Sequence, residues 1–260
     1  MARQEKLGSI GEDFDGVHTL GSEAAYLSVF QGVMTELHIF DVQQVEERMH
    51  EFWGSAMEHV LENILRDRTD LWVKGKQILK ELLMDVFPDQ IRPVPGATES
   101  TERLSKKFNL ALITAADRDV LLQKLFPKLG LRTEFFNGGI FTADQLDPRK
   151  NQYPKPHPHV LNEFMKRTGT VPQNTIMVGD SETDVLSAYA AGVEPVVTLT
   201  GNLSRKEAED LEVSHIIEDI TKLETDIIPR TIGRTGVGKF GWGLPADEKA
   251  WRSAHEISIV

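Results

Sequence analysis

The spacing of apolar residues between positions 22 and 87 is typical of amphipathic helices. Large apolar side chains recur three and four positions apart, which places them on one helix face. They do so from Ala25 to Leu37, from Val45 to Ile64 and from Ile78 to Val86. Because these stretches hold Met and aromatic side chains, we interpret them as the core of a helix bundle. Prolines at 88, 93 and 95, followed by Gly96, predict a linker after it.

Short apolar runs alternate with helical stretches after residue 96, which is a different pattern. The helical stretches include His159–Arg167 and Ser181–Ala191, and Gly192 is placed to end the second. Such alternation predicts a parallel sheet with right-handed crossovers, and ligands then bind at the carboxyl ends of the strands. The runs that we predict to be buried strands are 110–114, 138–142, 175–178, 195–199 and 214–217.

The last segment, residues 229–260, has neither helical nor strand periodicity and is rich in Gly. We predict an irregular tail there. Residues 233–239 do match the glycine and lysine spacing of a phosphate-binding loop. We reject that interpretation because Phe240 replaces the Ser or Thr that would hold Mg²⁺, and the following Gly-Trp-Gly-Leu-Pro cannot open a helix.

Composition narrows the classes of function. Hydrophobic residues make up 40% and charged residues 27% of the chain, so a sizeable core can form. The formal net charge of -11 argues against binding to nucleic acid or to an anionic membrane surface. The chain has no Cys, which excludes disulfides, thiolate metal sites and cysteine nucleophiles. No apolar stretch has the length of a signal peptide or membrane helix, so we expect a cytoplasmic protein.

Four groups of polar residues follow predicted strands: Asp13-Phe-Asp-Gly-Val17, Thr114, Lys155 and Gly179-Asp-Ser-Glu-Thr-Asp184. Phosphoryl transfer requires an in-line nucleophile, a proton donor for the leaving oxygen and positive charge around the transferring oxygens. A carboxylate can act as that nucleophile. Asp13 and Asp15 are two positions apart in an extended chain, so both can face one phosphate.

The same groups offer ligands for a cation and for a phosphate. Mg²⁺ takes oxygen ligands, and Asp13 and Asp180 can supply two carboxylates. Thr114 offers a hydroxyl, and backbone N–H groups near Ala115 can bind phosphate oxygens. Lys155 supplies a point charge to the phosphate and to the nucleophile.

Taken together, the four groups resemble the motifs of the haloacid-dehalogenase-like hydrolase superfamily, over residues 9 to 220. The branch that the chain resembles most is that of phosphoglycolate and sugar-phosphate phosphatases with a helical cap. The resemblance implies an α/β fold with a Rossmann-like parallel-sheet core, formed by residues 1–20 and 96–228. It also implies an inserted α-helical cap at residues 21–95, and caps of this kind close over small substrates.

The resemblance also implies the role of each site residue and a Mg²⁺ cofactor. Family dehalogenases lack an acid at the position of Asp15, so its presence favours phosphoryl transfer. The resemblance implies that Asp13 is the nucleophile and a metal ligand, and that Asp15 is the general acid and base with its backbone carbonyl on the metal. It implies phosphate binding for Thr114, Ala115 and Lys155. Asp180 would be a metal ligand, and Asp184 would contact the metal directly or through another group.

The function that we predict is hydrolysis of a small phosphorylated metabolite, of the phosphoglycolate or sugar-phosphate type, by a Mg²⁺-dependent phosphatase through an aspartyl-phosphate. One alternative is a sugar phosphomutase, which shares the first half-reaction. Another is a non-catalytic binding protein with a disabled site. Homo-oligomer formation is left open.

Two features depart from the family pattern. The strand before Asp13, Leu7 to Glu12, lacks the large apolar residues expected of a central strand, and Glu12 is unexpected beside the nucleophile. The segment from Val17 to Ser22 is one residue longer than usual. The weak first strand is what motivates the non-catalytic alternative.

Other polar residues near the motifs are more often structural. His18 could touch substrate, but a lone His beside a loop is more often structural. His157 and His159 lack a third ligand at zinc spacing, and we interpret them as loop and helix-start residues. The cap cations that could select a leaving group are Arg66, Arg68, Lys74 and Lys76, although we favour their interpretation as charges on a solvated helix face.

Overall fold

The computed structural model describes residues 6–39 and 42–228, and its centre is a six-stranded sheet. Every strand runs parallel to its neighbours in the order β5-β4-β1-β6-β7-β8. β1 therefore lies between β4 and β6, at the middle of the sheet. The strands are β1 (Ser9–Glu12), β4 (Asn109–Thr114), β5 (Gly139–Thr142), β6 (Thr175–Gly179), β7 (Glu194–Thr198) and β8 (His215–Ile217).

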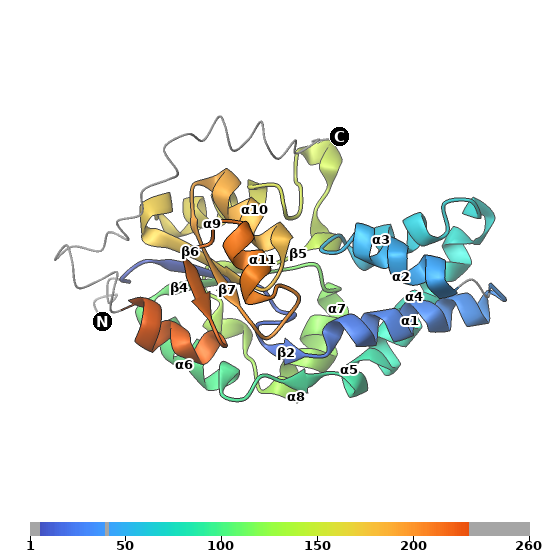
Figure 1. The fold of residues 1–260 in the computed structure, drawn as a ribbon, viewed down its shortest axis with the longest axis horizontal. Coiled ribbons are helices and arrows are strands. Elements are labelled where there is room, and N and C mark those ends of the chain that lie inside the picture. The colour runs from blue at the N-terminus through green and yellow to red at the C-terminus, as the bar shows by residue number, and fades with distance from the viewer. Residues whose placement is uncertain (1–5, 40–41, 229–260) are drawn as a thin grey trace.

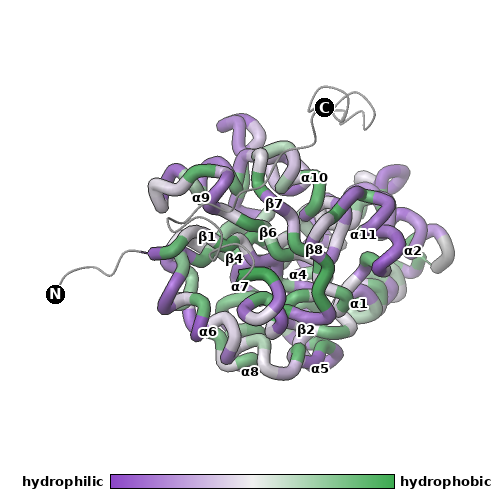
Figure 2. The backbone as a smooth tube through the Cα atoms, turned by 60° about the vertical axis from the view of Figure 1, so that its left-hand side comes forward, coloured by the Kyte–Doolittle hydropathy of each residue, from purple (hydrophilic) through white to green (hydrophobic). Residues whose placement is uncertain are grey.

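Helices cover both faces of this sheet (Figure 1). Side chains alternate along β4: Leu110 and Leu112 pack on one face, and Ala111 and Ile113 on the other. Figure 2 shows the strands as mostly hydrophobic and the outer helix α11 as hydrophilic. The first face is covered by α6 (Ala97–Lys107), α7 (Arg118–Val120), η2 (Leu121–Leu125), α8 (Phe126–Leu129), η7 (Ile220–Lys222) and η8 (Leu223–Ile227), and the second by α9 (His159–Thr168), α10 (Glu182–Ala191) and α11 (Arg205–Asp210).

Along the chain, a helical insertion follows β1 and precedes the other five strands of the sheet. Its helices α1 to α4 gather at one end of the molecule (Figure 1). The chain enters the insertion through β2 (Thr19–Leu20) and leaves through β3 (Arg92–Pro93), and these two strands pair antiparallel. The helices are α1 (Ser22–Glu36), α2 (Val42–Glu51), α3 (Met57–Ile64), η1 (Thr69–Leu71), α4 (Trp72–Asp85) and α5 (Phe87–Gln90). The predicted fold class, an α/β core with an inserted helical cap, is confirmed.

The boundaries of individual elements agree with the sequence pattern in most places. Each predicted strand after residue 96 is present with a shift of at most one residue, and α10 ends at Gly192 in the left-handed conformation. The linker predicted from Pro88 is wrong at its start, because α5 continues to Gln90. Proline is tolerated in the first turn of a helix, where its missing N–H has no partner to lose. Short helical turns complete the core: η3 (Thr133–Phe135), η4 (Ala143–Gln145), η5 (Pro148–Lys150) and η6 (Pro172–Asn174).

The domain boundaries at residues 20 and 95 stay predictions, although the paired strands β2 and β3 lie close to them. The tail at 229–260, with the rejected phosphate-loop match, lies outside the described residues. Within residues 6–39 and 42–228, no helix has both the length and the apolar character needed to cross a membrane.

β1 is a fully buried strand despite its small and polar residues. Gly11 faces α9, and a Cβ atom there would lie 3.0 Å from Met177 Sδ and 3.1 Å from Ile113 Cδ1. A large apolar side chain would therefore overpack this contact. Ser9 on the same face accepts a hydrogen bond from Thr170 at 3.0 Å. The expectation of a run of large apolar residues fails because neighbouring elements already fill the space around β1.

Glu12, the other unexpected residue of β1, has a partner in the core. Its Oε2 atom lies 3.1 Å from His18 Nε2 and accepts a hydrogen bond from Thr101 Oγ1 at 3.1 Å. The three side chains are at most 1% exposed. The backbone N–H of His18 donates to Phe14, and its carbonyl accepts from Val94 just after β3. The pair thus connects the strand before Asp13 to the crossing into the cap, and His18 is structural.

We expect single and double replacements of this pair to differ sharply. His18→Leu leaves a buried carboxyl group with Thr101 as its side-chain partner, which should lower the free energy of unfolding by about 3 kcal/mol. Glu12→Leu/His18→Leu removes both polar groups and should recover most of that loss. Urea unfolding of the parent, both single variants and the double variant measures the coupling. Losses that simply add in the double variant would contradict the pairing.

Candidate active site at the carboxyl ends of the strands

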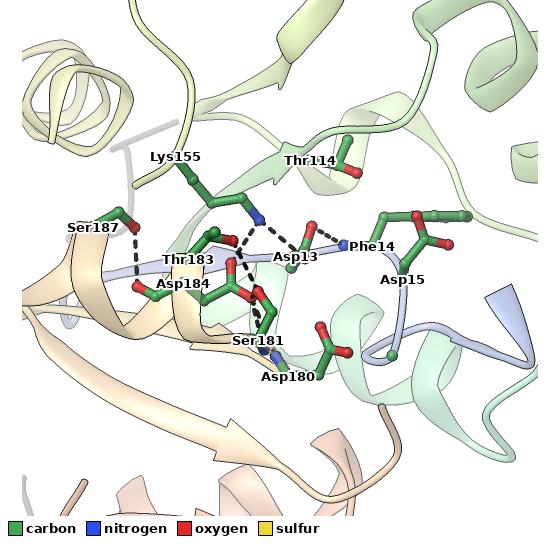
Figure 3. Close-up of polar contacts among 12 residues, drawn as sticks. Asp13, Phe14, Asp15, Thr114, Lys155, Asp180, Ser181, Thr183, Asp184 and Ser187 are labelled. Atoms are coloured by element: carbon green, nitrogen blue, oxygen red, sulfur yellow. Dashed lines mark hydrogen bonds and ion pairs between the residues drawn. The ribbon is translucent and has the colours of Figure 1, made fainter. Parts of the chain in front are cut away.

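The predicted site residues meet at the carboxyl ends of three adjacent strands (Figure 3). Asp13 follows β1, Thr114 ends β4 and Asp180 follows β6. Because β1 lies between β4 and β6, parallel pairing alone brings these three positions to one edge of the sheet. Lys155 reaches the same point from the segment before α9.

Lys155 is buried between two carboxylates. Its Nζ atom lies 3.0 Å from Asp13 Oδ2 and 2.6 Å from Asp184 Oδ1. Burial alone would lower the pKa of Lys155, but the charges of Asp13 and Asp184 outweigh burial and raise it. Lys155 therefore carries a fixed positive charge next to the position that a phosphate would occupy.

Asp13 is buried as well, and its carboxylate is held from two sides. Oδ1 accepts a hydrogen bond from the backbone N–H of Phe14 at 2.7 Å, and Oδ2 faces Lys155. Burial raises the pKa of Asp13 to about 7, although the ammonium of Lys155 opposes this rise. The charges of Asp184 and Asp15 contribute to the same rise. Nearby positive charge, from Lys155 and from a metal ion, is what favours the ionised form that a nucleophile needs.

Asp180 and Asp184 complete a group of three buried carboxylates with Asp13. Ligand atoms of the three lie within 4.8 Å of one another. Burial, together with the charges of Asp184 and Asp13, raises the pKa of Asp180 well above its ordinary range. A cluster of buried carboxylates that crowd one another is stabilised by a hard cation, and oxygen donors are the ligands that Mg²⁺ prefers. The donor set therefore fits a magnesium ion.

Asp184 is tied more firmly to protein groups than the other two carboxylates. Its Oδ2 atom accepts from Ser181 Oγ at 2.6 Å and from the backbone N–H groups of Ser181 and Asp180. Its Oδ1 atom faces Lys155. With both oxygens occupied, Asp184 is better placed to hold Lys155 and the Asp180 loop than to give up an oxygen to a metal.

Asp15 is oriented by hydroxyl groups from the start of the insertion. Thr19 Oγ1 donates to Oδ1 and Tyr26 Oη donates to Oδ2, each at 3.2 Å. Burial raises the pKa of Asp15, and hydrogen bonds from Ser22, Tyr26 and Thr19 offset part of the rise. A carboxyl group with a raised pKa retains a proton at higher pH, as a general acid must. Sequence reasoning missed the role of Tyr26, because its place in an apolar helix stripe concealed its hydroxyl.

Thr114 and Ala115 form the opposite wall of the site. Thr114 is buried, and its Oγ1 atom accepts a hydrogen bond from the backbone N–H of Ala116 at 3.1 Å. Asp117 accepts from the N–H groups of Asp119 and Val120 and so begins α7 directly after this loop. Thr114 and Ala115 line one pocket with Asp13, Asp15 and Lys155.

A loop after β7 closes the metal side of the site, and sequence reasoning missed it. The N–H of Asn202 donates to Asp180 Oδ2 at 2.9 Å, and the hydroxyls of Thr198 and Thr200 both donate to the carbonyl of Gly16. Gly16 has φ 70° and lies so close to Asp180 that a Cβ atom would clash with its carboxylate. The only sequence signal was the turn-forming residues after a predicted strand.

The helical insertion supplies the roof. Trp53, Gly54 and Met57 line the pocket above Asp13. With its nitrogen facing Glu23, the Asn202 side chain donates to Glu23 Oε2 at 3.1 Å and accepts from Trp53 Nε1 at 2.5 Å. The cap and the loop that holds Asp180 are thus in direct contact.

The remaining polar residues singled out in the sequence fall outside this pocket. His157 packs against Tyr153 with ring centroids 4.8 Å apart and lies 6.5 Å from His159. Of the four cap cations, Arg66 and Arg68 pair with nearby Asp residues, and Lys74 is exposed. Lys76 alone among them lines a cleft next to the site.

Similarity to known proteins agrees with this arrangement. A family model described as haloacid dehalogenase-like hydrolase matches residues 13–198. A phosphoglycolate phosphatase of Mesorhizobium japonicum is 30% identical over 162 residues, covering 61% of this chain and 68% of that protein. Pyrophosphatase PpaX of Bacillus pumilus is 25% identical over 191 residues, covering 74% and 82%. A solved hydrolase from Pseudomonas syringae has a TM-score of 0.64 at 23% identity over 85% of this chain and 98% of its own, which shows a shared fold.

The raised pKa of Asp13 predicts that Mg²⁺ binding depends on pH. A metal needs the ionised carboxylate, so the proton on Asp13 should make the Mg²⁺ affinity rise up to about tenfold per pH unit below pH 7, and the raised pKa of Asp180 should add to this dependence. Isothermal titration between pH 6 and 8 measures this, and Asp13→Asn should show a weaker dependence, caused by Asp180 alone. An affinity for Mg²⁺ that is unchanged over this range would contradict the assignment.

The same shift has a consequence for the metal-free protein. The folded protein binds the Asp13 proton more tightly than the unfolded chain, in which the pKa of Asp13 has its ordinary value of 3.8. The contribution of Asp13 to stability is therefore present at low pH and is lost as pH rises toward about 7. Thermal unfolding with and without Mg²⁺ at each pH would show this loss only when the metal is absent.

Proposed function

Because this chain belongs to the haloacid dehalogenase-like hydrolase family, we propose that it hydrolyses small phosphate monoesters through an aspartyl-phosphate on Asp13, with Mg²⁺ as cofactor. The observation that carries the proposal is the contact of Lys155 with Asp13 at 3.0 Å inside a group of buried carboxylates. This arrangement provides a nucleophile, a fixed cation and a metal-binding donor set in one pocket. Asp15 beside it provides the acid.

In the first half-reaction the Asp13 carboxylate attacks phosphorus and the bond to the leaving oxygen breaks. Asp15 gives its proton to that oxygen, so the alcohol leaves neutral. Lys155 neutralises charge on the phosphoryl oxygens, and Thr114 with the N–H of Ala115 would bind those oxygens. Mg²⁺, when bound, supplies further positive charge at this point, and Asp13, Asp180 and the backbone carbonyl of Asp15 would hold it.

In the second half-reaction Asp15 acts in the reverse sense. Now a carboxylate, it takes a proton from a water molecule, which attacks phosphorus and displaces the Asp13 carboxylate. Inorganic phosphate leaves, and Asp13 and the protonated Asp15 are regenerated. Thr19 and Tyr26 hold the Asp15 carboxyl group in one orientation in both steps.

The alternatives left open by the sequence receive less support. The non-catalytic alternative rested on a weak first strand, yet β1 is buried and paired on both sides. A phosphomutase must hold a second phosphate in the cap. The cap cations that line the cleft, Lys76 and Lys80, are engaged by carboxylates. Analysis of products separates these activities, since a phosphatase releases inorganic phosphate and a mutase releases an isomerised ester.

Replacing the nucleophile tests the proposal directly. Asp13→Asn keeps the side-chain shape and removes the attacking oxygen anion, so phosphate release from para-nitrophenyl phosphate with Mg²⁺ should fall by roughly 10³-fold or more. The matched control is Asp210→Asn on exposed α11, which should retain the parent rate. Retention of activity in Asp13→Asn, or its absence in the parent with every ester tried, would reject the proposed function.

Replacing the acid should discriminate between leaving groups. Asp15→Asn cannot donate a proton, and general acids contribute roughly 10²–10⁴-fold. The loss in kcat/KM should be large for an alkyl phosphate, whose leaving alkoxide is a strong base, and much smaller for para-nitrophenyl phosphate. Equal losses on both substrates would show that Asp15 does not protonate the leaving group.

A further inference from the structure

A cleft of about 1110 Å³ adjoins the catalytic pocket and lies between the cap and the core. It shares Met57 and Ala115 with that pocket, so a leaving group bound to a phosphate at Asp13 would extend into it. On the cap side it is lined by α3 and α4, and on the core side by residues 143–149. Pockets for drug-sized ligands measure about 300–1,000 Å³, so the cleft has room for far more than two or three carbon atoms.

Carboxylates outnumber cations in this cleft. Its lining includes three Lys and Arg side chains and five Asp and Glu side chains, so with His59 neutral its net charge is -2. The carboxylates belong to Glu58, Glu62, Asp117, Asp144 and Asp147. An anionic leaving group would therefore enter a negative field.

The cations of the cleft already have partners. Lys76 Nζ lies 2.6 Å from Glu62 and 3.2 Å from Glu58. Lys80 of α4 contacts both oxygens of Asp117, at 2.6 and 2.7 Å, and so bridges the cap and the core. Such half-exposed ion pairs are individually weak. A carboxylate of the substrate that displaced one acid from Lys76 would nevertheless still lie next to the other acid that contacts this lysine.

The inner pocket does not offer a cation for a carboxylate either. Among its described lining residues the only Lys or Arg is Lys155, which contacts Asp13 and Asp184. The side chains toward the cap are Tyr26, Trp53 and Met57, which provide aromatic and apolar surface. Even a short leaving group with a terminal carboxylate would lie beside Asp15 without a counter-charge.

These contacts lead to an inference about substrate class, which rests on the proposed function. We propose that the enzyme selects phosphate monoesters whose leaving group is uncharged and rich in hydroxyl groups, such as polyol or sugar phosphates. Esters whose leaving group carries a carboxylate, such as phosphoglycolate, are disfavoured. Hydroxyl groups can donate to the cleft carboxylates, whereas a carboxylate cannot. Glu58 and Glu62 are specificity-determining residues because they neutralise Lys76.

Matched substrate pairs test the inference. 2-Hydroxyethyl phosphate and phosphoglycolate differ only in a terminal hydroxyl or carboxylate on two carbons. Sorbitol 6-phosphate and 6-phosphogluconate differ in the same way on six carbons and reach the cleft. The full chain with Mg²⁺ should hydrolyse the neutral member of each pair with a kcat/KM about tenfold or more above that of the carboxylate. An equal or higher kcat/KM for the carboxylates would overturn the inference.

Variants of the cleft test which residues cause the discrimination against leaving groups that carry a carboxylate. Glu58→Gln/Glu62→Gln frees Lys76, so the kcat/KM for 6-phosphogluconate should rise at least about fivefold relative to sorbitol 6-phosphate. Glu81→Gln is the control, because it removes a negative charge from the exposed face of α4, the helix of Lys76, at a position outside the cleft. An unchanged ratio in the double variant would overturn the role of Glu58 and Glu62.

Failure of this inference is distinguishable from failure of the proposed function. Hydrolysis of para-nitrophenyl phosphate but of neither neutral ester would overturn the substrate class and leave the phosphatase activity intact. No release of phosphate from any ester would reject the phosphatase activity itself, and the inference with it.

Discussion

The ion pairs of the Lys155 ammonium group with Asp13 and Asp184 are the interactions on which the rest of the site depends. Asp13, Asp180 and Asp184 are all buried, and burial of carboxylates without compensation is costly. Lys155 contacts Asp13 and Asp184 directly, while Asp180 relies on the N–H of Asn202. The carboxylates of Asp13 and Asp180 are therefore only partly compensated by protein groups, so that either protons or a metal ion would neutralise them. The donor set is thus one that a bound cation would stabilise.

Strand order explains how such distant residues meet. The positions of the strands are the part of the structure that the sequence predicts best. Apolar runs and their spacing gave every core strand after residue 96 to within one residue, and the topology of a parallel sheet then placed the polar residues that follow strands at one edge. β1 was the exception. Its small and polar residues fit the close approach of Met177 to Gly11 and the pairing of Glu12 with His18. Neither contact can be predicted from the sequence around β1 alone.

The site shows the same division between local and long-range information. Asp13, Lys155 and Asp180 belong to the groups that carry the family resemblance, so their proximity could be anticipated. Tyr26 and Asn202 could not, because their roles arise from contacts between segments far apart in the chain. Charge pairing in the cap is equally hidden: Lys76 in the sequence is simply a basic residue on a helix, and only the structure brings Glu58 and Glu62 to it.

The contacts of Asn202 join the helical cap to the candidate metal-binding group. Its backbone holds the carboxylate of Asp180, while its side chain bonds Glu23 and Trp53 of the cap. Movement of the cap away from the core would break the side-chain contacts and remove Trp53 from the roof of the pocket. On the opposite side, the bond from Lys80 to Asp117 would break as well, next to the loop of Thr114 and Ala115. Under the proposed function, closure of the cap would therefore affect both the carboxylates that would hold Mg²⁺ and the loop that would bind phosphate. It would link exclusion of water from the pocket to the arrangement of the catalytic groups.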